Sequence, residues 1–180
     1  MLVLLTINNN IQKGADPNLG IWGVTALELA WQRSSFYRPS GLAVMRSLFQ
    51  HGAKAPLQVF ISAITAKDTE VLEMLLDRVE TLDADKLLVV GFTACHYGDE
   101  KVLQRLLERH LFGVKDRIKR KVFAGWVVND TPLHVAIRRQ NVEVIELLLR
   151  EGADVHAVND DIDTPLDFAS QELRWLLHLE

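Results

Sequence analysis

The feature that most constrains this chain is a short sequence that occurs twice at a fixed interval. Thr-Pro-Leu begins at Thr131 and begins again at Thr164, 33 residues later. An apolar segment that ends at Gly152 lies between the two copies. A period of this length indicates stacked supersecondary units, each of which buries its apolar face against its neighbours and not in one central core.

The residues that follow the first copy favour two antiparallel helices joined by a tight turn. Thr131 is a favourable helix N-cap, and Pro132 suits the first helical position because its missing N–H group costs nothing there. Ala136 is small enough to let two helices approach closely. A second helix is predicted to start at Asn141, because its apolar residues recur at helical spacing. Gly152 then provides the left-handed turn that ends this helix.

Residues 129–159 resemble an ankyrin repeat. They match the family pattern TPLHxAxxxxxxxVIxLLLxxGADV almost throughout. The resemblance implies an all-α solenoid of stacked helix–turn–helix repeats with short β-hairpin connections. It also implies that His134, which belongs to the signature, bonds to the backbone of a neighbouring turn.

Degraded copies of the pattern cover most of the remaining chain. The positions equivalent to Thr131 are Thr25, Gln58, Val89 and Thr164, at spacings of 33, 31, 42 and 33 residues. The longest interval contains an insertion of about nine residues relative to the period. We therefore predict a single ankyrin-repeat domain over residues 1–180, made of a partial repeat at 1–18, repeats at about 19–54, 55–86, 87–128 and 129–159, and a partial C-terminal repeat at 160–180. We also expect further repeats or another domain to precede this segment in a longer chain, because its N-terminal part has few charges for a terminal repeat.

The composition excludes several classes of protein. The chain is 48% hydrophobic and 24% charged, which is ordinary for a globular protein. Its one cysteine excludes an internal disulfide framework and suits a reducing compartment. No apolar segment approaches membrane-spanning length. The net charge of −4 argues against a general nucleic-acid binder. We therefore expect an intracellular protein, cytoplasmic or nuclear, with no membrane partner.

We expect no catalytic residue, no cofactor and no metal site. Cys95 and His96 are adjacent, but neighbouring helix residues point in different directions and cannot act on one another. In the repeat register Cys95 takes an inward position, so we interpret it as a buried packing residue. A calcium loop counted from Asp161 would need glycine at its sixth place, where Leu166 stands. The acidic cluster at 160–163 is therefore predicted to be a solvated hairpin tip.

Residues 115–121 place five basic side chains among seven residues, within the long insertion. We interpret this basic segment as a solvated loop or a short extra helix, which packs through Ile118, Val122 and Phe123. The two functional alternatives are a nuclear-import patch and a loop that contacts anions.

The resemblance also implies where a partner binds, because ankyrin-family proteins usually bind through hairpin tips and first helices that line a concave groove. The positions of this chain that match the tips and the groove are Trp22, Val24, Val128 and Asp130 at the tips, and Gln32, Arg33, His96, Tyr97, Arg138 and Arg139 in the groove. Arg, Tyr and Trp are enriched among interface anchors, and the middle of this row is basic or neutral. We therefore expect the groove to bind an extended or helical peptide with acidic residues. The alternative interpretation is that these are ordinary exposed residues.

We predict from these observations a non-catalytic protein–protein interaction module. One alternative is a nucleic-acid or phosphate-binding adaptor that uses the basic segment 115–121 together with Arg138 and Arg139, which steep salt dependence of binding would favour. Another alternative is a regulatory fragment of a larger enzyme whose catalytic domain lies outside this chain.

Overall fold

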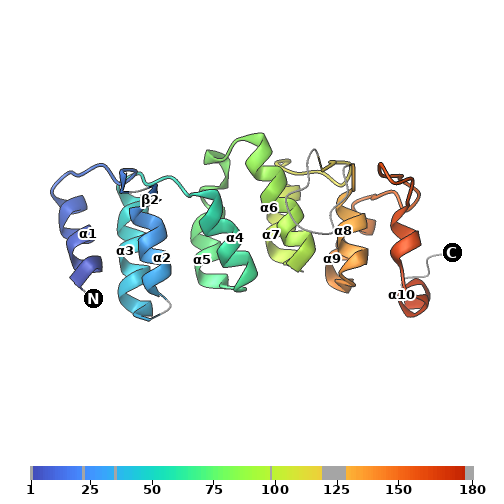
Figure 1. The fold of residues 1–180 in the computed structure, drawn as a ribbon, viewed down its shortest axis with the longest axis horizontal. Helices are drawn as coiled ribbons and strands as arrows, with labels where there is room; N and C mark the ends of the chain where they lie inside the picture. The colour runs from blue at the N-terminus through green and yellow to red at the C-terminus, as the bar shows by residue number, and fades with distance from the viewer. Residues whose placement is uncertain (1, 22, 35, 98, 119–128, 177–180) are drawn as a thin grey trace. The chain divides into compact units, whose positions relative to one another are not determined.

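The computed structural model of the 180-residue chain describes residues 2–21, 23–34, 36–97, 99–118 and 129–176. These residues are mostly helical (Figure 1). The chain separates into two compact units, Met1–Leu82 and Asp83–Glu180, and each unit is described by itself. The repeat boundaries expected from the sequence, and the continuity of the repeats between these units, stay predictions.

The first unit consists of antiparallel helices with one small hairpin. Its elements are α1 (Leu2–Gln12), β1 (Gly20–Ile21), β2 (Val24–Thr25), α2 (Ala26–Ser34), α3 (Arg38–Gln50), α4 (Leu57–Thr65), α5 (Thr69–Leu76) and the 3₁₀ helix η1 (Val79–Thr81). β1 pairs with β2 in antiparallel register. Helix α3 packs against both α1 and α2, and α4 packs against α2 and α5. The order along the chain therefore follows the predicted pairs of helices.

Small residues set the close approaches in this unit. Ala30 in α2 and Ala63 in α4 are fully buried, as the small inward position of the repeat requires. Gly41 in α3 lies against Ser34, and a Cβ atom added to this glycine would be 2.6 Å from the Cβ of Ser34. The end of α2 and the start of α3 are therefore in direct contact.

The second unit also consists of helix pairs. We call the first helix of each pair the inner helix and the second helix the outer helix. Its elements are α6 (Ala84–Tyr97), α7 (Glu100–Glu108), α8 (Pro132–Arg138), α9 (Val142–Arg150), the 3₁₀ helix η2 (Pro165–Phe168) and α10 (Gln171–Leu176). The inner helices α6 and α8 pack against each other, and so do the outer helices α7 and α9. Helix η2 continues the inner row by packing on α8. Figure 1 shows α8 and α9 side by side in orange, next to α6 and α7 in green.

The threonine positions predicted as helix caps form reciprocal hydrogen bonds in three repeats. Thr25 N–H donates to the Glu28 carboxylate at 2.7 Å, and the Glu28 N–H donates to the hydroxyl of Thr25 at 3.2 Å. Thr131 N–H donates to Nδ1 of His134 at 3.1 Å, and Thr164 N–H donates to a carboxylate oxygen of Asp167 at 2.6 Å. Each pair satisfies backbone donors that the first helical turn leaves free. The predicted caps are confirmed, although the partner residue differs in each repeat.

The degraded repeats start their helices elsewhere than the register predicts. Val89, which aligns with Thr131, lies inside α6 and not at its start. Without a threonine–proline signal α6 begins earlier, where Asp83 accepts a hydrogen bond from the Lys86 N–H at 2.9 Å. Gln58 likewise lies inside α4, whose N-cap is Pro56. The inner helices of these repeats are therefore positioned by their apolar faces.

The described part of the insertion is not helical. Ile118 is buried, and its N–H donates to the carbonyl of Asp130 at 3.1 Å while its carbonyl accepts from the Asn129 N–H at 2.9 Å. This pair of bonds closes the base of the insertion against the start of the next repeat. Val122 and Phe123 lie outside the described residues.

Candidate partner-binding surface

The C-terminal end of α6 carries a fixed pair of aromatic rings. His96 and Tyr97 are both half-buried, and their ring centroids lie 4.9 Å apart with an interplanar angle of 66°. The Asn141 side-chain amide donates to the carbonyls of Cys95 and His96 at 2.7 and 3.2 Å, and Asn141 is also the N-cap residue of α9. The next repeat therefore holds the backbone beneath these rings in place.

Arg139 adds a positive charge beside this aromatic pair. It is the exposed C-cap residue of α8, the inner helix that packs against α6. Burial lowers the pKa of His96 below its ordinary value, and the positive charge of Arg139 lowers it further. His96 is therefore neutral at neutral pH, and Arg139 supplies the cation of this site. We refer to His96, Tyr97 and Arg139 as the first-helix surface.

Two residues predicted on the partner surface have a different position. Asp130 was expected at an exposed tip, and this expectation is wrong because its side chain is fully buried. It accepts two hydrogen bonds from the Arg138 guanidinium, at 2.6 and 2.8 Å, and a third from the Asn159 amide at 2.9 Å. The Arg138 guanidinium also lies over the ring of Phe168, with 4.1 Å between its central carbon and the ring centroid. A buried carboxylate needs such partners to offset its lost hydration, so Asp130 and Arg138 hold the fold together at this position.

Of the other residues that the sequence predicts to contact a partner, some lie within the part of the chain that the structure describes and some lie outside it. In the first unit, Val24 lies in β2 and is half-buried, whereas Gln32 and Arg33 are exposed at the end of α2. Trp22 and Val128 lie outside the described residues. The first-helix surface therefore keeps three of the residues expected in the second unit, and the first unit contributes a separate exposed pair.

The basic segment has a partly structural role. Arg117 donates two hydrogen bonds, to the carbonyl of Asn129 at 2.8 Å and to the carbonyl of Val158 at 2.6 Å. It therefore ties the insertion to the loops that precede α8 and η2. Lys115 is exposed, and residues 119–121 lie outside the described part of the chain.

Two predictions about buried residues are confirmed. Nε2 of His134 donates to the carbonyl of Asp163 at 3.0 Å, which is the bond to a neighbouring turn that the repeat signature implies. Burial is the main cause that lowers the pKa of His134 below its ordinary value. Cys95 is fully buried, and this burial raises the pKa of its thiol, so it packs as a small apolar residue.

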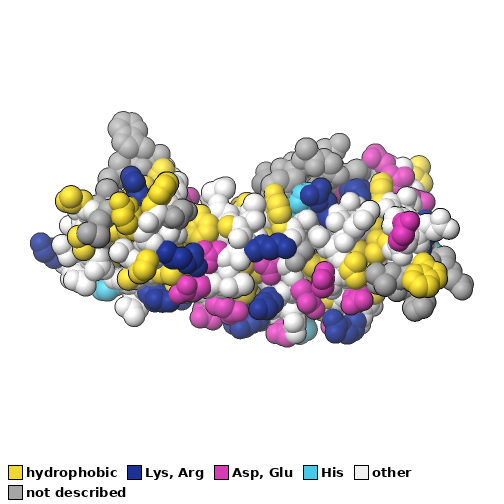
Figure 2. Space-filling model, turned by 90° about the horizontal axis from the view of Figure 1, so that it is seen from below, with side chains coloured by type: hydrophobic (Ala, Val, Ile, Leu, Met, Phe, Trp, Pro, Cys, Tyr) yellow, Lys and Arg dark blue, Asp and Glu magenta, His cyan; other side chains and the backbone are white. Residues whose placement is uncertain are grey.

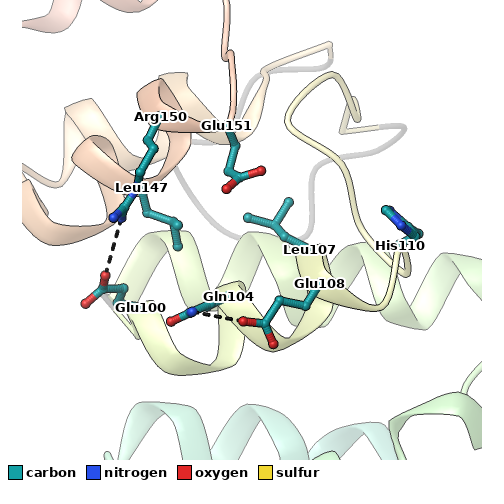
Figure 3. Close-up of a pocket in the computed structure, with 8 residues that line it drawn as sticks. All are labelled: Glu100, Gln104, Leu107, Glu108, His110, Leu147, Arg150 and Glu151. Carbon is teal, nitrogen blue, oxygen red and sulfur yellow. Dashed lines mark hydrogen bonds and ion pairs between the residues drawn. The ribbon is translucent and has the colours of Figure 1, made fainter.

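A shallow surface cleft that the sequence did not indicate lies between the outer helices α7 and α9. Its volume is about 340 Å³, and its lining residues are Glu100, Gln104, Leu107, Glu108, His110, Leu147, Arg150 and Glu151 (Figure 3). Gln104 donates to Glu108 at 2.9 Å, and Arg150 lies 3.9 Å from the Glu100 carboxylate. The polar groups of this cleft thus interact mainly with one another.

The surface charges are mixed on the face that Figure 2 shows, where Lys and Arg side chains lie among Asp and Glu side chains. Within the described residues, no group of three or more His, Cys, Asp or Glu side chains is arranged to hold a metal ion. Among the same residues, no helix is long and apolar enough to cross a membrane.

Comparisons with known proteins agree with this geometry. Residues 129–160 match the family model described as ankyrin repeat. Human ankyrin repeat and SOCS box protein 11 is 32% identical over 126 residues, which cover 66% of this chain and 36% of that protein. Alpha-latrocrustotoxin-Lt1a from Latrodectus tredecimguttatus is 31% identical over 81 residues, which cover 45% of this chain and 5% of the toxin. The chain therefore spans 5% to 36% of the length of these two curated relatives.

Solved structures show the same fold. The ankyrin repeat domain of Bcl-3 matches 96% of this chain and 75% of its own, with a TM-score of 0.60 and 22% identity. The ankyrin repeat domain of human ASB11 matches 98% of this chain and 93% of its own, with a TM-score of 0.58 and 24% identity.

The capped inner helices and the packed outer helices define a helical repeat protein. Residues 129–160 are an ankyrin repeat by their family match, and the chain has the fold of ankyrin repeat domains. Ankyrin repeat domains are generally protein–protein interaction modules, and the fold is typically non-catalytic.

Proposed function

We propose that this chain binds a partner protein through the first-helix surface, and that the bound segment carries acidic residues. The observation that carries the proposal is the pairing of two half-buried aromatic rings with an exposed arginine at the ends of neighbouring inner helices. Tyr and Arg are the residue types that most often dominate binding energy, and rigid aromatic side chains lose little conformational entropy on binding.

The electrostatics of this surface favour a carboxylate as the contacting group. Arg139 is exposed, and its guanidinium can form two parallel hydrogen bonds with a carboxylate. His96 stays neutral at neutral pH because of its lowered pKa, so it adds no second positive charge beside Arg139. Tyr97 adds apolar contact area beside these polar groups.

In the first unit, Gln32 and Arg33 form a second exposed pair at the end of α2, and Val24 marks the hairpin tip. We propose that these residues add contacts to the same class of partner. Trp22 and Val128 remain proposed contacts from sequence alone.

The nucleic-acid alternative finds less support in the described residues. Arg138 is committed to the buried Asp130, and Arg117 is committed to two backbone carbonyls. A phosphate would therefore have to displace existing hydrogen bonds at both residues. Binding to single- or double-stranded nucleic acid that falls steeply with salt concentration would reverse this ranking.

We also propose that this binding takes place inside the cell, in the cytoplasm or the nucleus, where ankyrin repeat proteins are commonly found. Fractionation of cells that express the natural protein tests this point, and recovery of the protein only from the medium would contradict it.

The central experiment selects ligands from a random-peptide phage library against the immobilised chain. We expect the selected peptides to be enriched in Asp and Glu, and Arg139→Glu to weaken their binding about tenfold or more. Lys101→Glu is the matched control, because it makes the same charge change at an exposed position of α7, an outer helix. Equal effects of the two variants, or selection of peptides without acidic residues, would refute the proposal.

A further inference from the structure

The repeat that contains α6 and α7 is longer than the repeat pattern at two places. Helix α6 has 14 residues, whereas α8, the inner helix of the next repeat, has seven. Because Val89 aligns with Thr131, the N-cap of α8, residues 84–88 extend α6 beyond the pattern. The loop that follows α7 is also longer, since it begins the insertion described above. A second surface cleft, with a volume of about 620 Å³, lies between these two additions.

The two walls of this cleft are mainly apolar. One wall comes from the added turn of α6, through Ala84 and Leu88, and the other comes from residues 110–117 of the loop, where Leu111 contributes. Leu88 and Leu111 are only half-buried, so they leave apolar surface open within the cleft. Its volume lies in the range of about 300–1,000 Å³ that is typical of small-molecule sites. We refer to this space as the insertion cleft.

The loop wall is fixed onto α6 by a buried aromatic ring. Phe112 is 4% exposed, and its ring meets that of Phe92 edge to face, with 5.3 Å between the ring centroids. Gly91 makes room for this ring, because a Cβ atom added to the glycine would lie 2.4 Å from a ring carbon of Phe112. The Asp116 carboxylate accepts from the Gly113 N–H at 2.8 Å, which closes the loop. The cleft is therefore formed before a ligand binds, and binding does not have to order it.

The lining of the insertion cleft carries more positive than negative charge. Lys115 is exposed and, within the described part of the chain, forms no hydrogen bond or ion pair. Arg117 donates to two backbone carbonyls, but these groups are neutral, so its positive charge still acts on the cleft. Asp116 is the one carboxylate among the described residues that line the cleft, and His110 adds a polar ring. An anionic group is therefore favoured beside Lys115.

The shape and polarity of the walls favour an alkyl chain as the other part of a ligand. The phenyl ring of Phe112 is almost fully buried, so it offers a nucleotide base no face for stacking. A bare inorganic anion would leave the apolar surface of Leu88 and Leu111 in contact with water. An aliphatic chain would cover that surface, and each of its buried CH₂ groups would add favourable free energy.

We propose that the insertion cleft binds a small amphipathic anion, an alkyl chain that ends in a carboxylate. The chain lies along Leu88 and Leu111, and the carboxylate contacts the ammonium group of Lys115. Such a site gives a role to the first residues of the basic segment 115–121, for which the sequence allowed a loop that contacts anions. It takes a small molecule and not a partner protein, so it does not depend on the first-helix surface.

The test titrates the protein with three soluble probes, each below its micellar concentration, and follows the backbone amides by heteronuclear NMR. Decanoate carries both the chain and the negative charge, butanoate lacks most of the chain, and decyltrimethylammonium carries the opposite charge. We expect decanoate to bind about tenfold more tightly than either of the other probes. It should shift the amide resonances of residues 84–88 and 110–117.

Three variants separate the contribution of the charge from that of the chain. Lys115→Glu reverses the charge beside the cleft, so it should weaken decanoate binding about tenfold and strengthen the binding of decyltrimethylammonium. Lys101→Glu is the matched control, since it makes the same change at an exposed position of α7 outside the cleft, and both affinities should stay within about twofold. Leu88→Gln retains the positive charges but removes apolar surface, so it should weaken decanoate and leave butanoate unchanged.

Four results would overturn the proposal. Equal affinity for decanoate and decyltrimethylammonium would show adsorption of the alkyl chain alone, and equal affinity for decanoate and butanoate would show that no wall holds the chain. Equal effects of Lys115→Glu and Lys101→Glu would show a general attraction of anions. Resonance shifts centred outside residues 84–88 and 110–117 would place the ligand elsewhere on the molecule.

Discussion

Two helix pairs of this chain share the same inner and outer arrangement, but different residues determine where their inner helices begin. In the pair α8–α9 the inner helix starts at the box of Thr131 and His134, whereas in the pair α4–α5 it starts after Pro56 without a side-chain cap. Both inner helices bury a small alanine, and both pairs turn through a residue with positive φ, 54° at Gln140 and 51° at Lys67. The spacing of apolar residues is therefore sufficient to form the helix pair.

What the signature adds is a connection between successive repeats. His134 bonds to the backbone of Asp163, and the buried Asp130 binds both Arg138 and Asn159. The pair α4–α5 is connected to α3 differently, through ion pairs of the exposed Arg38 and Arg46. Arg38 binds Asp68, whose side chain is 9% exposed, and both arginines bind the exposed Glu70. A buried network can stabilise a repeat strongly, while exposed ion pairs contribute little. The following predictions test this difference, from the largest expected effect to the smallest.

Loss of the buried carboxylate should have the largest effect. Asp130→Ala leaves the partly buried Arg138 and the Asn159 amide without their acceptor, so we expect the free energy of unfolding to fall by about 3 kcal/mol. Urea denaturation followed by circular dichroism measures this change. A loss below about 1 kcal/mol would mean that the network is as weak as the exposed ion pairs of the other helix pair.

Loss of the helix cap should have an intermediate effect. Thr131→Ala removes the hydroxyl that accepts from the His134 N–H, and we expect a loss of about 1–2 kcal/mol. The matched variant is Gln58→Ala in α4, an exposed position that aligns with Thr131 but makes no cap, where the change should stay within about 0.5 kcal/mol. Equal losses in both variants would contradict a special role for the signature.

A pH-dependent loss of stability should belong to the signature repeat. The pKa of His134 is lowered in the folded chain, so below its ordinary value of about 6.5 the unfolded chain binds more protons. Stability should therefore fall as the pH decreases through that value towards the lowered one. His134→Gln should flatten this part of the stability profile, measured as urea midpoints at a series of pH values. An unchanged slope would assign the effect to another group, such as His96, whose pKa is also lowered.

Removal of an exposed ion pair should have the smallest effect. Glu70 contacts Arg38 at 3.5 Å and Arg46 at 2.6 Å, and all three side chains are well exposed. We expect Glu70→Ala to change the free energy of unfolding by less than about 1 kcal/mol, and less still in high salt. If this loss matched that of Asp130→Ala, the contrast between the two helix pairs would be wrong.

The sequence predicted the structure best at positions where a residue type has a single local role in the repeat. The threonine caps, the inward Cys95 and the hydrogen bond of His134 to a neighbouring turn could all be predicted, because each follows from the repeat pattern. The register was less informative where the pattern was degraded: Val89 aligns with a cap but lies inside α6. The last repeat, which the sequence predicts only as a partial one, begins with a four-residue 3₁₀ helix, η2, and not with an α-helix.

The candidate site was only partly predictable. His96, Tyr97 and Arg139 lie where the repeat register places them, at or near the surface. Asp130 is a charged residue at a position where the repeat pattern predicts an exposed tip. It is nevertheless fully buried, because the side chains of Arg138 and Asn159 both donate hydrogen bonds to it. No local pattern shows this, since Asn159 is 29 residues away from Asp130 along the chain.

The sequence by itself determined the repeat pattern, the period and the faces of the helices, because caps and apolar spacing act over only a few residues. Only the tertiary structure decided which charged groups are available to a partner. Arg117 and Arg138 are engaged within the fold, while Arg139 and the carboxylates beside Ile162 remain exposed. The physical reason is that the solvation of a charge depends on groups brought together from distant repeats.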